Sequence, residues 1–333
     1  MYNTLKTLCM IPSVSGRENA IREKIMELIA PLADECRVDN LGNLIAVKHG
    51  TAPDKKKIML CAHMDEIGFL VTHIEEKGFV RVATVGGISF TASNASEVIS
   101  ERGVRGVLIA EGGVKPSDFS ADKFIIDIGA KNKKEAERRV KIGDFFVVRP
   151  TLSKLGGSRV CGRPLDDRIG CAVILEIAKQ LATTAPKHDV YYVFSVQEEV
   201  GCRGAKTAAF AIAPDYALVY DVTGTGDVPG SKPMDCELGG GAAIKIKDSS
   251  VICHTETVDM LCETAKEHKI PYQLEILTYG GTDTSSIQMS GVGVRAAALS
   301  IPSRYIHSGV ECADMKDAEA CAALSVKFIE ELK

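Results

Sequence analysis

The second half of the chain alternates between short apolar runs of strand length and longer segments with helical periodicity. After Arg163 these segments are helix 168–181, strand 190–196, strand 216–220, helix 256–268, strand 273–277, strand 294–300 and helix 315–332. Regular alternation of this kind is typical of a mostly parallel sheet flanked by helices on both faces. The apolar run at 57–62 adds a buried central strand to the same sheet. We therefore predict an α/β fold.

A further helix is predicted near the N-terminus. Ser15 and Glu18 have the spacing of a capping box, and the apolar stripe that follows them ends at Pro31. We expect this pair to start the helix.

The segment from about 69 to 150 has a different texture. Its short apolar runs are separated by turns that contain glycine, and they lie at 69–74, 79–85, 106–110, 124–128 and 145–148. Closely spaced short strands are typical of a small barrel or sandwich. We predict a catalytic domain made of residues 1–68 and 156–333, interrupted by a β-rich insertion at 69–155.

Charge and cysteine usage exclude several classes of partner and location. The net charge is −4, and the densest cationic stretch, 131–141, alternates with acidic residues as a solvated helix face does. We therefore expect no binding of nucleic acid or anionic lipid, and no run of about 18 apolar residues is present to span a membrane. The eleven cysteines form no CxxC pair, and several lie in apolar runs, which favours reduced thiols and a cytoplasmic location.

Candidate metal ligands recur where the predicted strands end. These acidic and imidazole side chains are His63, Asp65, Glu198, Glu199, Asp221 and His307. Ligands bind at the carboxyl ends of the strands in open α/β sheets, where so many acidic groups would repel one another without cations. Two imidazoles and three carboxylates suit zinc-like ions, and one carboxylate can bridge two ions, as in two-metal hydrolases.

The spacing of these residues suggests separate roles. Asp65 can accept the outer N–H of a ligating His63 and so set its tautomer. Of the adjacent Glu198 and Glu199, one can bind metal while the other takes a proton. Each motif alone also has an ordinary explanation: an incidental strand-end histidine, an exposed Glu-Glu turn, or a helix N-cap for Asp166 and Asp167.

Six motifs together identify a known family. They are CAHMDEIGF (61–69), GRPLDDRIGC (162–171), SVQEEVGCRGA (195–205), YDVTGTGD (220–227), YGGTDTSSI (279–287) and SRYIHSG (303–309). In this order and over nearly the whole chain, they closely resemble the tetrahedral (TET-type) glutamyl aminopeptidase and endoglucanase-like family, metallopeptidase family 42. The resemblance implies a phosphorylase/hydrolase-like di-zinc peptidase fold with an inserted small, PDZ-like β-barrel, and a metal-dependent aminopeptidase that acts on peptides.

The resemblance also implies two divalent metal ions per subunit, zinc in the first place, with cobalt or manganese as alternatives. Asp166 would bridge the two ions. His63 and Asp221 would complete the ligands of one ion, and Glu199 and His307 those of the other. The peptide bond after Asp166 is expected to be cis, as in relatives.

The remaining roles implied by the resemblance concern catalysis and substrate binding. Glu198 would be the general base, and Asp65 the partner of His63. Four residues match a stretch that lines the substrate pocket in relatives: Gly280, Gly281, Thr282 and Asp283. An ordinary turn is the alternative for the two glycines.

The same residue types also allow two other functions. A glycoside hydrolase with paired carboxylates is disfavoured by the two imidazoles, and a non-catalytic, self-assembling metal-binding shell is disfavoured because no ligand is missing.

The resemblance implies dimers, built by the insertion, that assemble into a tetrahedral dodecamer. Around 86–101 the sequence departs from the family pattern, which leaves a dimer as the main alternative. The residue types do not settle which N-terminal side chain is preferred.

Overall fold

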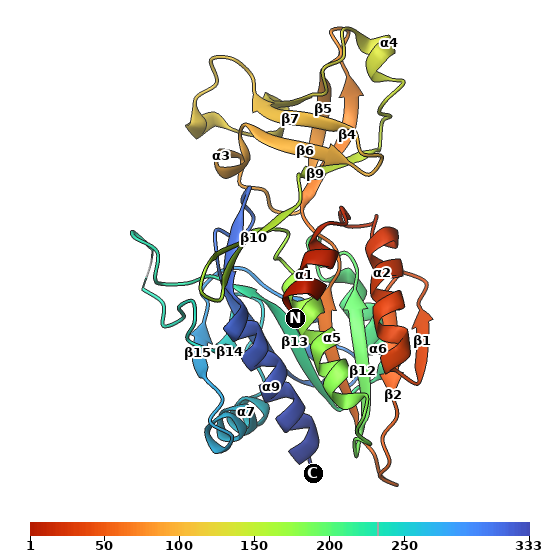
Figure 1. Cartoon of the computed structure of the whole chain (residues 1–333), viewed down its shortest axis with the longest axis vertical. Coiled ribbons are helices and arrows are strands. Elements are labelled where there is room, and N and C mark those ends of the chain that lie inside the picture. The colour runs from red at the N-terminus through yellow and green to blue at the C-terminus, as the bar shows by residue number, and fades with distance from the viewer. Residues whose placement is uncertain (232) are drawn as a thin grey trace.

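The computed structural model describes residues 1–231 and 233–333, which form a large α/β body and a small barrel at one end of the long axis (Figure 1). Within these residues the large sheet has eleven strands. Nine of them follow the order β1-β2-β12-β3-β13-β16-β17-β11-β10, and β14 pairs with both β15 and β16. The strands are β1 (Glu35–Val38), β2 (Leu44–Lys48), β3 (Lys57–His63), β10 (Thr151–Gly156), β11 (Arg159–Arg163), β12 (Asp189–Ser195), β13 (Tyr216–Thr223), β14 (Ala242–Lys247), β15 (Tyr272–Ile276), β16 (Arg295–Arg304) and β17 (Glu311–Asp314).

The central strands β12, β3, β13 and β16 are parallel, and antiparallel strands extend the sheet on either side. This arrangement confirms the predicted mostly parallel α/β sheet. The register aligns His63 with Ser195, and Asp221 with Ser300. The carboxyl ends of the central strands therefore meet along one edge of the sheet.

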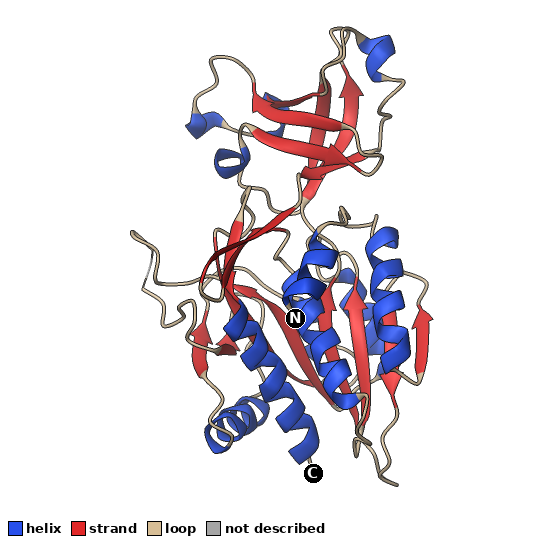
Figure 2. Ribbon diagram, in the orientation of Figure 1, coloured by secondary structure: helices blue, strands red, loops and turns tan. Residues whose placement is uncertain are grey.

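Helices cover both faces of the sheet (Figure 2). One layer contains α1 (Tyr2–Cys9), α2 (Asn19–Ile29), α5 (Arg168–Leu181), α7 (Thr255–Glu267) and α9 (Met315–Glu331), and the other contains α6 (Arg203–Ile212) and α8 (Asp283–Gln288). Alternate residues of β3 pack into the two layers, with Leu60 and Ala62 on one side and Met59 and Cys61 on the other. This two-sided burial explains why the strand is an unbroken apolar run. Among the described residues, no helix has both the length and the apolar character needed to cross a membrane.

The inserted segment forms a closed antiparallel barrel in the order β4-β5-β8-β7-β6-β9. Its elements are β4 (Gly68–Ile74), β5 (Val80–Val85), α3 (Phe90–Ser93), β6 (Ser96–Ser100), β7 (Arg105–Ala110), β8 (Phe124–Asp127), α4 (Lys133–Ala136) and β9 (Phe145–Val148), with the 3₁₀ turns η2 (Pro116–Asp118) and η3 (Ala121–Lys123). A third 3₁₀ turn, η1 (Ala30–Leu32), follows α2. The barrel has its own apolar core, which includes Phe69, Phe124 and Phe146. Of the two predicted shapes, barrel or sandwich, the chain adopts the barrel.

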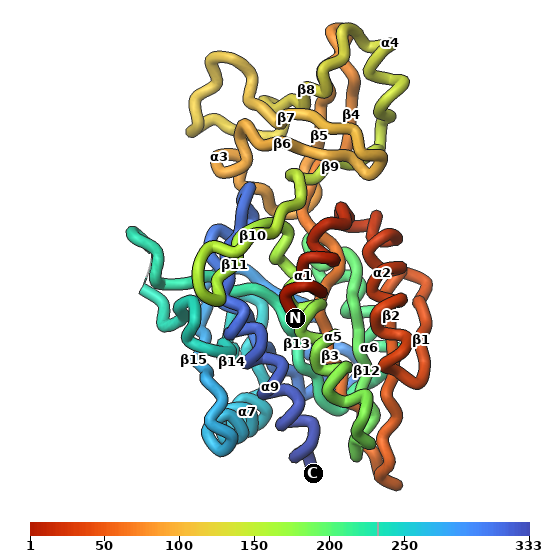
Figure 3. Tube along the Cα trace, in the orientation of Figure 1, coloured from red at the N-terminus to blue at the C-terminus, as the bar shows by residue number. Residues whose placement is uncertain are grey.

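The chain enters the barrel after β3 and returns from β9 to β10 (Figure 3). β10 pairs with β11 and so belongs to the large sheet, although all but its last residue lie inside the predicted 69–155 insertion. The division at 68/69 and 155/156 stays a prediction.

Candidate metal centre

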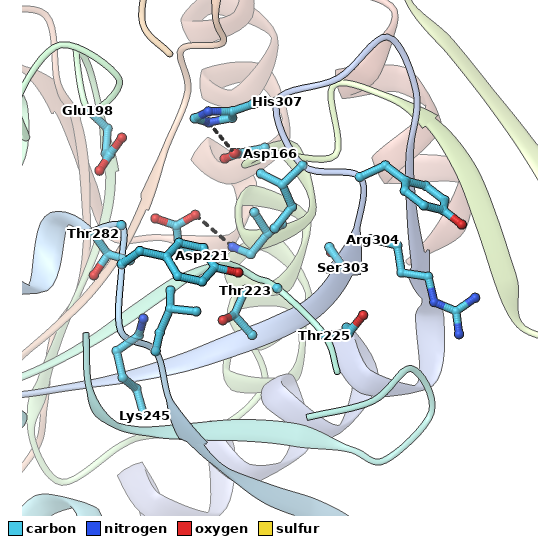
Figure 4. A pocket seen from close by; sticks show the side chains of 18 of the residues that line it. Asp166, Glu198, Asp221, Thr223, Thr225, Lys245, Thr282, Ser303, Arg304 and His307 are labelled. Carbon is cyan, nitrogen blue, oxygen red and sulfur yellow. Dashed lines mark hydrogen bonds and ion pairs between the residues drawn. The ribbon is translucent and has the colours of Figure 1, made fainter. Parts of the chain in front are cut away.

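A cavity of about 530 Å³ opens where the central strands end (Figure 4). The five predicted metal ligands and the predicted base line it: His63, Asp166, Glu198, Glu199, Asp221 and His307. His63 is the last residue of β3, Asp221 lies in β13, and Glu199 and His307 follow β12 and β16. The parallel register of the sheet has brought together side chains that are up to 244 residues apart in sequence (His63 to His307, 307 − 63).

Asp166 lies between two imidazoles, each of which approaches a different carboxylate oxygen. Oδ1 is 3.1 Å from Nε2 of His63, and Oδ2 is 3.2 Å from Nε2 of His307. Oδ1 of Asp221 lies 3.8 Å from the His63 nitrogen, and Oε2 of Glu199 lies 3.2 Å from the His307 nitrogen. The five predicted ligands thus fall into two groups, with Asp166 common to both.

Within residues 1–231 and 233–333, the buried oxygen atoms of these side chains lack enough hydrogen-bond donors to balance them. The Glu199 side chain is 4% exposed, and its buried Oε1 has no hydrogen-bond partner among the described residues. Burial raises the pKa of Glu199 to about 7, and the charge of Asp166 acts in the same direction. Burial alone would lower the pKa of His307, but the carboxylates of Asp166 and Glu199 raise it to about 11. Buried carboxylates that can be balanced only by protonating an imidazole indicate a place for positive ions.

The adjacent Asp166 and Asp167 have different surroundings. Asp167 is the N-cap of α5, where it accepts the N–H of Gly170 on Oδ1 (3.0 Å) and the N–H of His63 on Oδ2 (3.2 Å). The N-cap explanation therefore applies to Asp167, whereas both oxygens of Asp166 face the imidazoles. The peptide bond between the two is cis, as expected.

Glu311 supports the same segment, and nothing in the sequence had singled it out. This residue is 1% exposed, and its Oε2 accepts the backbone N–H groups of Leu165 at 2.6 Å and Asp166 at 3.2 Å. Its burial in β17 gives no local pattern that would have distinguished it from other strand residues.

Asp65 contacts His63 mainly through its backbone. The Nδ1 atom of His63 is 3.1 Å from the Asp65 carbonyl oxygen and 3.5 Å from Oδ1. The carboxylate accepts the N–H of Glu198 on Oδ1 at 3.0 Å, and on Oδ2 the N–H of Glu199 at 3.2 Å and the Ser15 hydroxyl at 2.6 Å. Burial works to raise the pKa of Asp65, but His63 and the other donors hold it below its usual value. A buried, charged Asp65 therefore fixes the turn that presents Glu198 and Glu199.

The predicted capping box at Ser15 and Glu18 is wrong. Helix α2 begins at Asn19, and Glu18 occupies the N-cap without a side-chain cap bond. The Ser15 hydroxyl binds Asp65 instead, and Glu18 Oε1 accepts the N–H groups of Gly16 at 2.7 Å and Gln197 at 3.1 Å. Both side chains therefore form hydrogen bonds elsewhere and do not cap the first turn of α2.

Glu198 lines the cavity and stands apart from Asp166 and His307 (Figure 4). Burial raises the pKa of its carboxyl well above the usual value, and the charges of Asp221 and Asp283 act in the same direction. A carboxylate with a raised pKa is a better proton acceptor near neutral pH.

The predicted substrate stretch divides at Thr282. Gly280, Gly281 and Thr282 line the cavity, and Gly280 has a φ of +68°, a conformation that favours glycine. Asp283 is not among the lining residues. It is 1% exposed at the start of α8, and its Oδ2 accepts the Ser195 hydroxyl at 2.6 Å.

Other lining residues had not been predicted. They include Thr223, Lys245, Leu277 and Tyr279. Lys245 is fully buried in β14, with Nζ 2.7 Å from Glu275 and 3.3 Å from Asp248. Its ammonium group is therefore already balanced by two carboxylates.

The barrel segment reaches the centre through its Gly86-Gly87 turn. A Cβ atom added at Gly87 would lie 3.3 Å from Nδ1 of His307, and one at Gly86 would lie 3.2 Å from Cβ of Glu199. The Ser89 N–H donates to the His307 carbonyl at 3.3 Å. The start of the unusual 86–101 segment thus packs against one of the two ligand groups.

Comparisons with known proteins place the chain in one family of peptidases. The M42 glutamyl aminopeptidase family matches residues 42–324. The lysyl aminopeptidase of Pyrococcus furiosus is 35% identical over 345 residues, which cover 100% of this chain and 97% of the relative. The structure of aminopeptidase APDkam598 from the archaeon Desulfurococcus kamchatkensis has a TM-score of 0.94 at 37% identity, covering 99% of this chain and 94% of that one. The TET1 peptidase of Pyrococcus horikoshii, which can assemble into a tetrahedron or a large octahedral shell, has a TM-score of 0.88 at 35% identity and 99% coverage of both chains.

Proposed function

This chain belongs to the M42 glutamyl aminopeptidase family and is an aminopeptidase, and from that premise we propose that it removes N-terminal residues from peptides with two co-catalytic divalent metal ions. The observation that supports this mechanism most directly is the position of Asp166, whose two oxygens face Nε2 of His63 and Nε2 of His307 at 3.1 and 3.2 Å. The family match confirms the resemblance drawn from the six motifs and supports a peptidase over a glycoside hydrolase.

The proposed ligands are those that the geometry divides into two groups. Asp166 would be shared, His63 and Asp221 would hold one ion, and Glu199 and His307 would hold the other. Mixed imidazole and carboxylate ligands suit zinc, and cobalt or manganese remain alternatives within the same proposal. When bound, such a pair would supply Lewis-acid chemistry, polarising the scissile carbonyl and activating water.

Glu198 would act as the general base. It lines the same cavity, its backbone is held by Asp65, and burial raises the pKa of its carboxyl. In the proposed reaction its carboxylate receives a proton from the attacking water and later delivers that proton to the nitrogen of the departing amine. Asp65 touches no substrate in this scheme and serves as a positioning residue.

Substrate would enter the cavity beside Gly280, Gly281 and Thr282. The cavity is also lined by apolar and hydroxyl side chains, including Val222, Thr223, Leu277 and Tyr279. A peptide N-terminus with its first side chain fits a cavity of about 530 Å³ better than a folded protein surface does. Asp283 would contribute from behind the wall, by fixing the start of α8.

We further propose a homo-oligomer in which the barrel makes subunit contacts. A related TET1 peptidase can assemble into a tetrahedron, and this supports a tetrahedral dodecamer built from dimers for this chain. The insertion would then serve as dimerisation module and lid, since its Gly86-Gly87 turn approaches His307 and Glu199. All eleven cysteines are free, which supports a cytoplasmic location.

Elemental analysis of the purified protein tests the core of the proposal. We expect close to two divalent ions per chain, and a chelator should abolish peptidase activity until the ions are returned. One ion per chain with full activity would remove the bridging role of Asp166. Activity that resists chelation altogether would remove the metal mechanism.

A further inference from the structure

A second cluster of metal-binding side chains adjoins the proposed catalytic base. One donor atom each of Glu198, Cys202 and Asp283 lies within 4.8 Å of the other two. None of the three belongs to the five proposed ligands of the co-catalytic ions. The cluster is also the only one of the candidate metal groups among the described residues that contains a sulfur atom.

The cluster is built into a fixed turn. The Cys202 thiol donates to Oε1 of Glu198 at 3.3 Å, and the Cys202 backbone N–H donates to the Glu198 carbonyl at 2.9 Å. Cys202 has a φ of +52° and forms the N-cap of α6, so its Cα and Cβ atoms are fixed at the start of that helix. Thiol and carboxylate are therefore held side by side on one loop.

Asp283 supplies an oxygen that has no other use. The side chain is buried, and Oδ2 is already engaged by the Ser195 hydroxyl at 2.6 Å. Oδ1 is buried and has no hydrogen-bond partner in the described part of the chain. A buried carboxylate oxygen without a donor is costly unless a cation or a bound water satisfies it.

The separations suit a tetrahedral ion. Bond lengths of about 2.3 Å to sulfur and 2.0 Å to oxygen place neighbouring ligand atoms roughly 3.5 Å apart. The thiol and the Glu198 oxygen are 3.3 Å apart already, and an Asp283 oxygen lies within 4.8 Å of each ligand atom. Glu198 lines the cavity, which gives an ion an entry path and leaves room for a water as fourth ligand.

We propose that Glu198, Cys202 and Asp283 form a third, inhibitory cation site that selects thiophilic divalent ions such as Cd²⁺ or Zn²⁺ in excess. The thiol proton is released to solvent when the ion binds. An ion held on Glu198 prevents that carboxylate from accepting a proton, so hydrolysis stops while the co-catalytic ions stay in place. The inhibition rests on the proposed role of Glu198, whereas binding of the ion does not.

Cadmium offers a spectroscopic test that is independent of activity. The protein is first saturated with Zn²⁺ at the co-catalytic centre and then titrated with Cd²⁺, while both the ultraviolet cadmium–thiolate absorption band and the hydrolysis of an aminoacyl-anilide are followed. The proposed co-catalytic ligands are nitrogen and oxygen atoms, so exchange there produces no thiolate band. The rate of each variant is expressed relative to its own cadmium-free rate.

Four variants make the test specific. Cys202→Ala removes the thiol, and Cys202→Ser keeps a hydroxyl donor for Glu198 in case the alanine variant fails to fold. Cys36→Ser and Cys161→Ser are matched controls, because Cys36 is partly exposed on β1 and Cys161 faces Cys312 across β11 and β17. We expect both Cys202 variants to lose the band and to need at least about tenfold more Cd²⁺ for inhibition, since soft ions prefer thiolate to hydroxyl ligands. The two controls should behave as the wild type.

The outcomes separate the site from its consequence. A band that persists in both Cys202 variants would overturn the site. A band that is lost while inhibition is unchanged would overturn its inhibitory role. A Cys202-dependent band without any inhibition would support the site and would count against Glu198 as general base, which is a failure of the proposed function and not of the binding site.

Discussion

Replacing Asp65 by asparagine tests how the catalytic turn is held. The Asp65 carboxylate is fully buried and accepts the backbone N–H of Glu198 at 3.0 Å and that of Glu199 at 3.2 Å, on different oxygens. An asparagine amide has one oxygen and one NH₂ group, so in either orientation one of these N–H groups faces another donor. A buried donor that loses its acceptor costs about 1–3 kcal/mol.

The lost hydrogen bond should lower the stability of the protein and also its catalytic rate and metal affinity. Displacing a catalytic group by about 1 Å lowers the rate roughly 10²-fold. Glu199, a proposed metal ligand, lies on the same turn, and loss of a residue that orients a ligand weakens metal binding about 10–100-fold. We therefore expect Asp65→Asn to lower kcat/KM about 10²-fold even at saturating metal, and to shift the metal dependence of activity to higher concentrations.

The assay is kcat/KM on an aminoacyl-anilide at rising Zn²⁺ concentration, together with thermal unfolding of the metal-loaded protein. The loaded protein is the right reference, because removing one negative charge from this cluster relieves repulsion when no ion is bound. Asp317→Asn is the matched control. Asp317 is also fully buried and accepts two backbone N–H groups, those of Gly239 and Gly241 at 2.8 Å each, but it does not line the cavity.

The control should lose comparable stability and keep its metal dependence and its kcat. Wild-type kcat/KM for Asp65→Asn at saturating metal would refute the positioning role. Equal losses of activity in both variants would show that the effect is general destabilisation.

Three further predictions follow from the same contacts. Glu198→Gln should retain both ions and substrate affinity but lose at least about 10²–10⁴-fold in turnover, whereas Glu199→Gln should weaken one ion; wild-type turnover in Glu198→Gln would mean that another group is the base. Burial and Asp65 raise the pKa of Glu18 from 4.5 to about 7, so wild-type stability should fall relative to Glu18→Gln as pH rises from 4.5 through 7 and the difference should then level off. Oε1 of Glu18 accepts both of its N–H donors, so glutamine can mimic the protonated acid, and parallel pH profiles of the two unfolding midpoints would contradict this account. Native mass spectrometry at several concentrations should find a dodecamer built from dimers; a stable monomer would exclude the proposed role of the barrel.

The fold was accessible from sequence because its signals are local. Helix α5 occupies the predicted range 168–181, and β3 lies within one residue of the predicted strand 57–62. In both elements the spacing of apolar residues records which faces are buried, and a central parallel strand must be apolar on both faces. The capping box at Ser15 failed because a capping bond competes with distant partners that no local window contains.

The candidate ligands were likewise accessible, because parallel strands bring their carboxyl ends to one edge. Residue types that follow several such strands can be expected to converge even when the order of the strands is unknown. That reasoning found His63, Asp221 and Glu199 as a set, and the cavity that opens at this edge contains all of them.

Only the tertiary structure showed which partners each of these groups contacts. The adjacent Asp166 and Asp167 have the same chemistry, but Asp167 accepts the backbone N–H of His63 whereas Asp166 faces the imidazoles of His63 and His307. The support of the ligand segment by Glu311, the approach of Gly87 to His307 and the grouping of Cys202 with Asp283 all join residues that are distant in sequence. Such contacts produce no periodic pattern in the sequence, because they depend on how whole elements pack against one another. The sequence therefore determined which chemical groups reach the site, and the packing determined what each of them contacts.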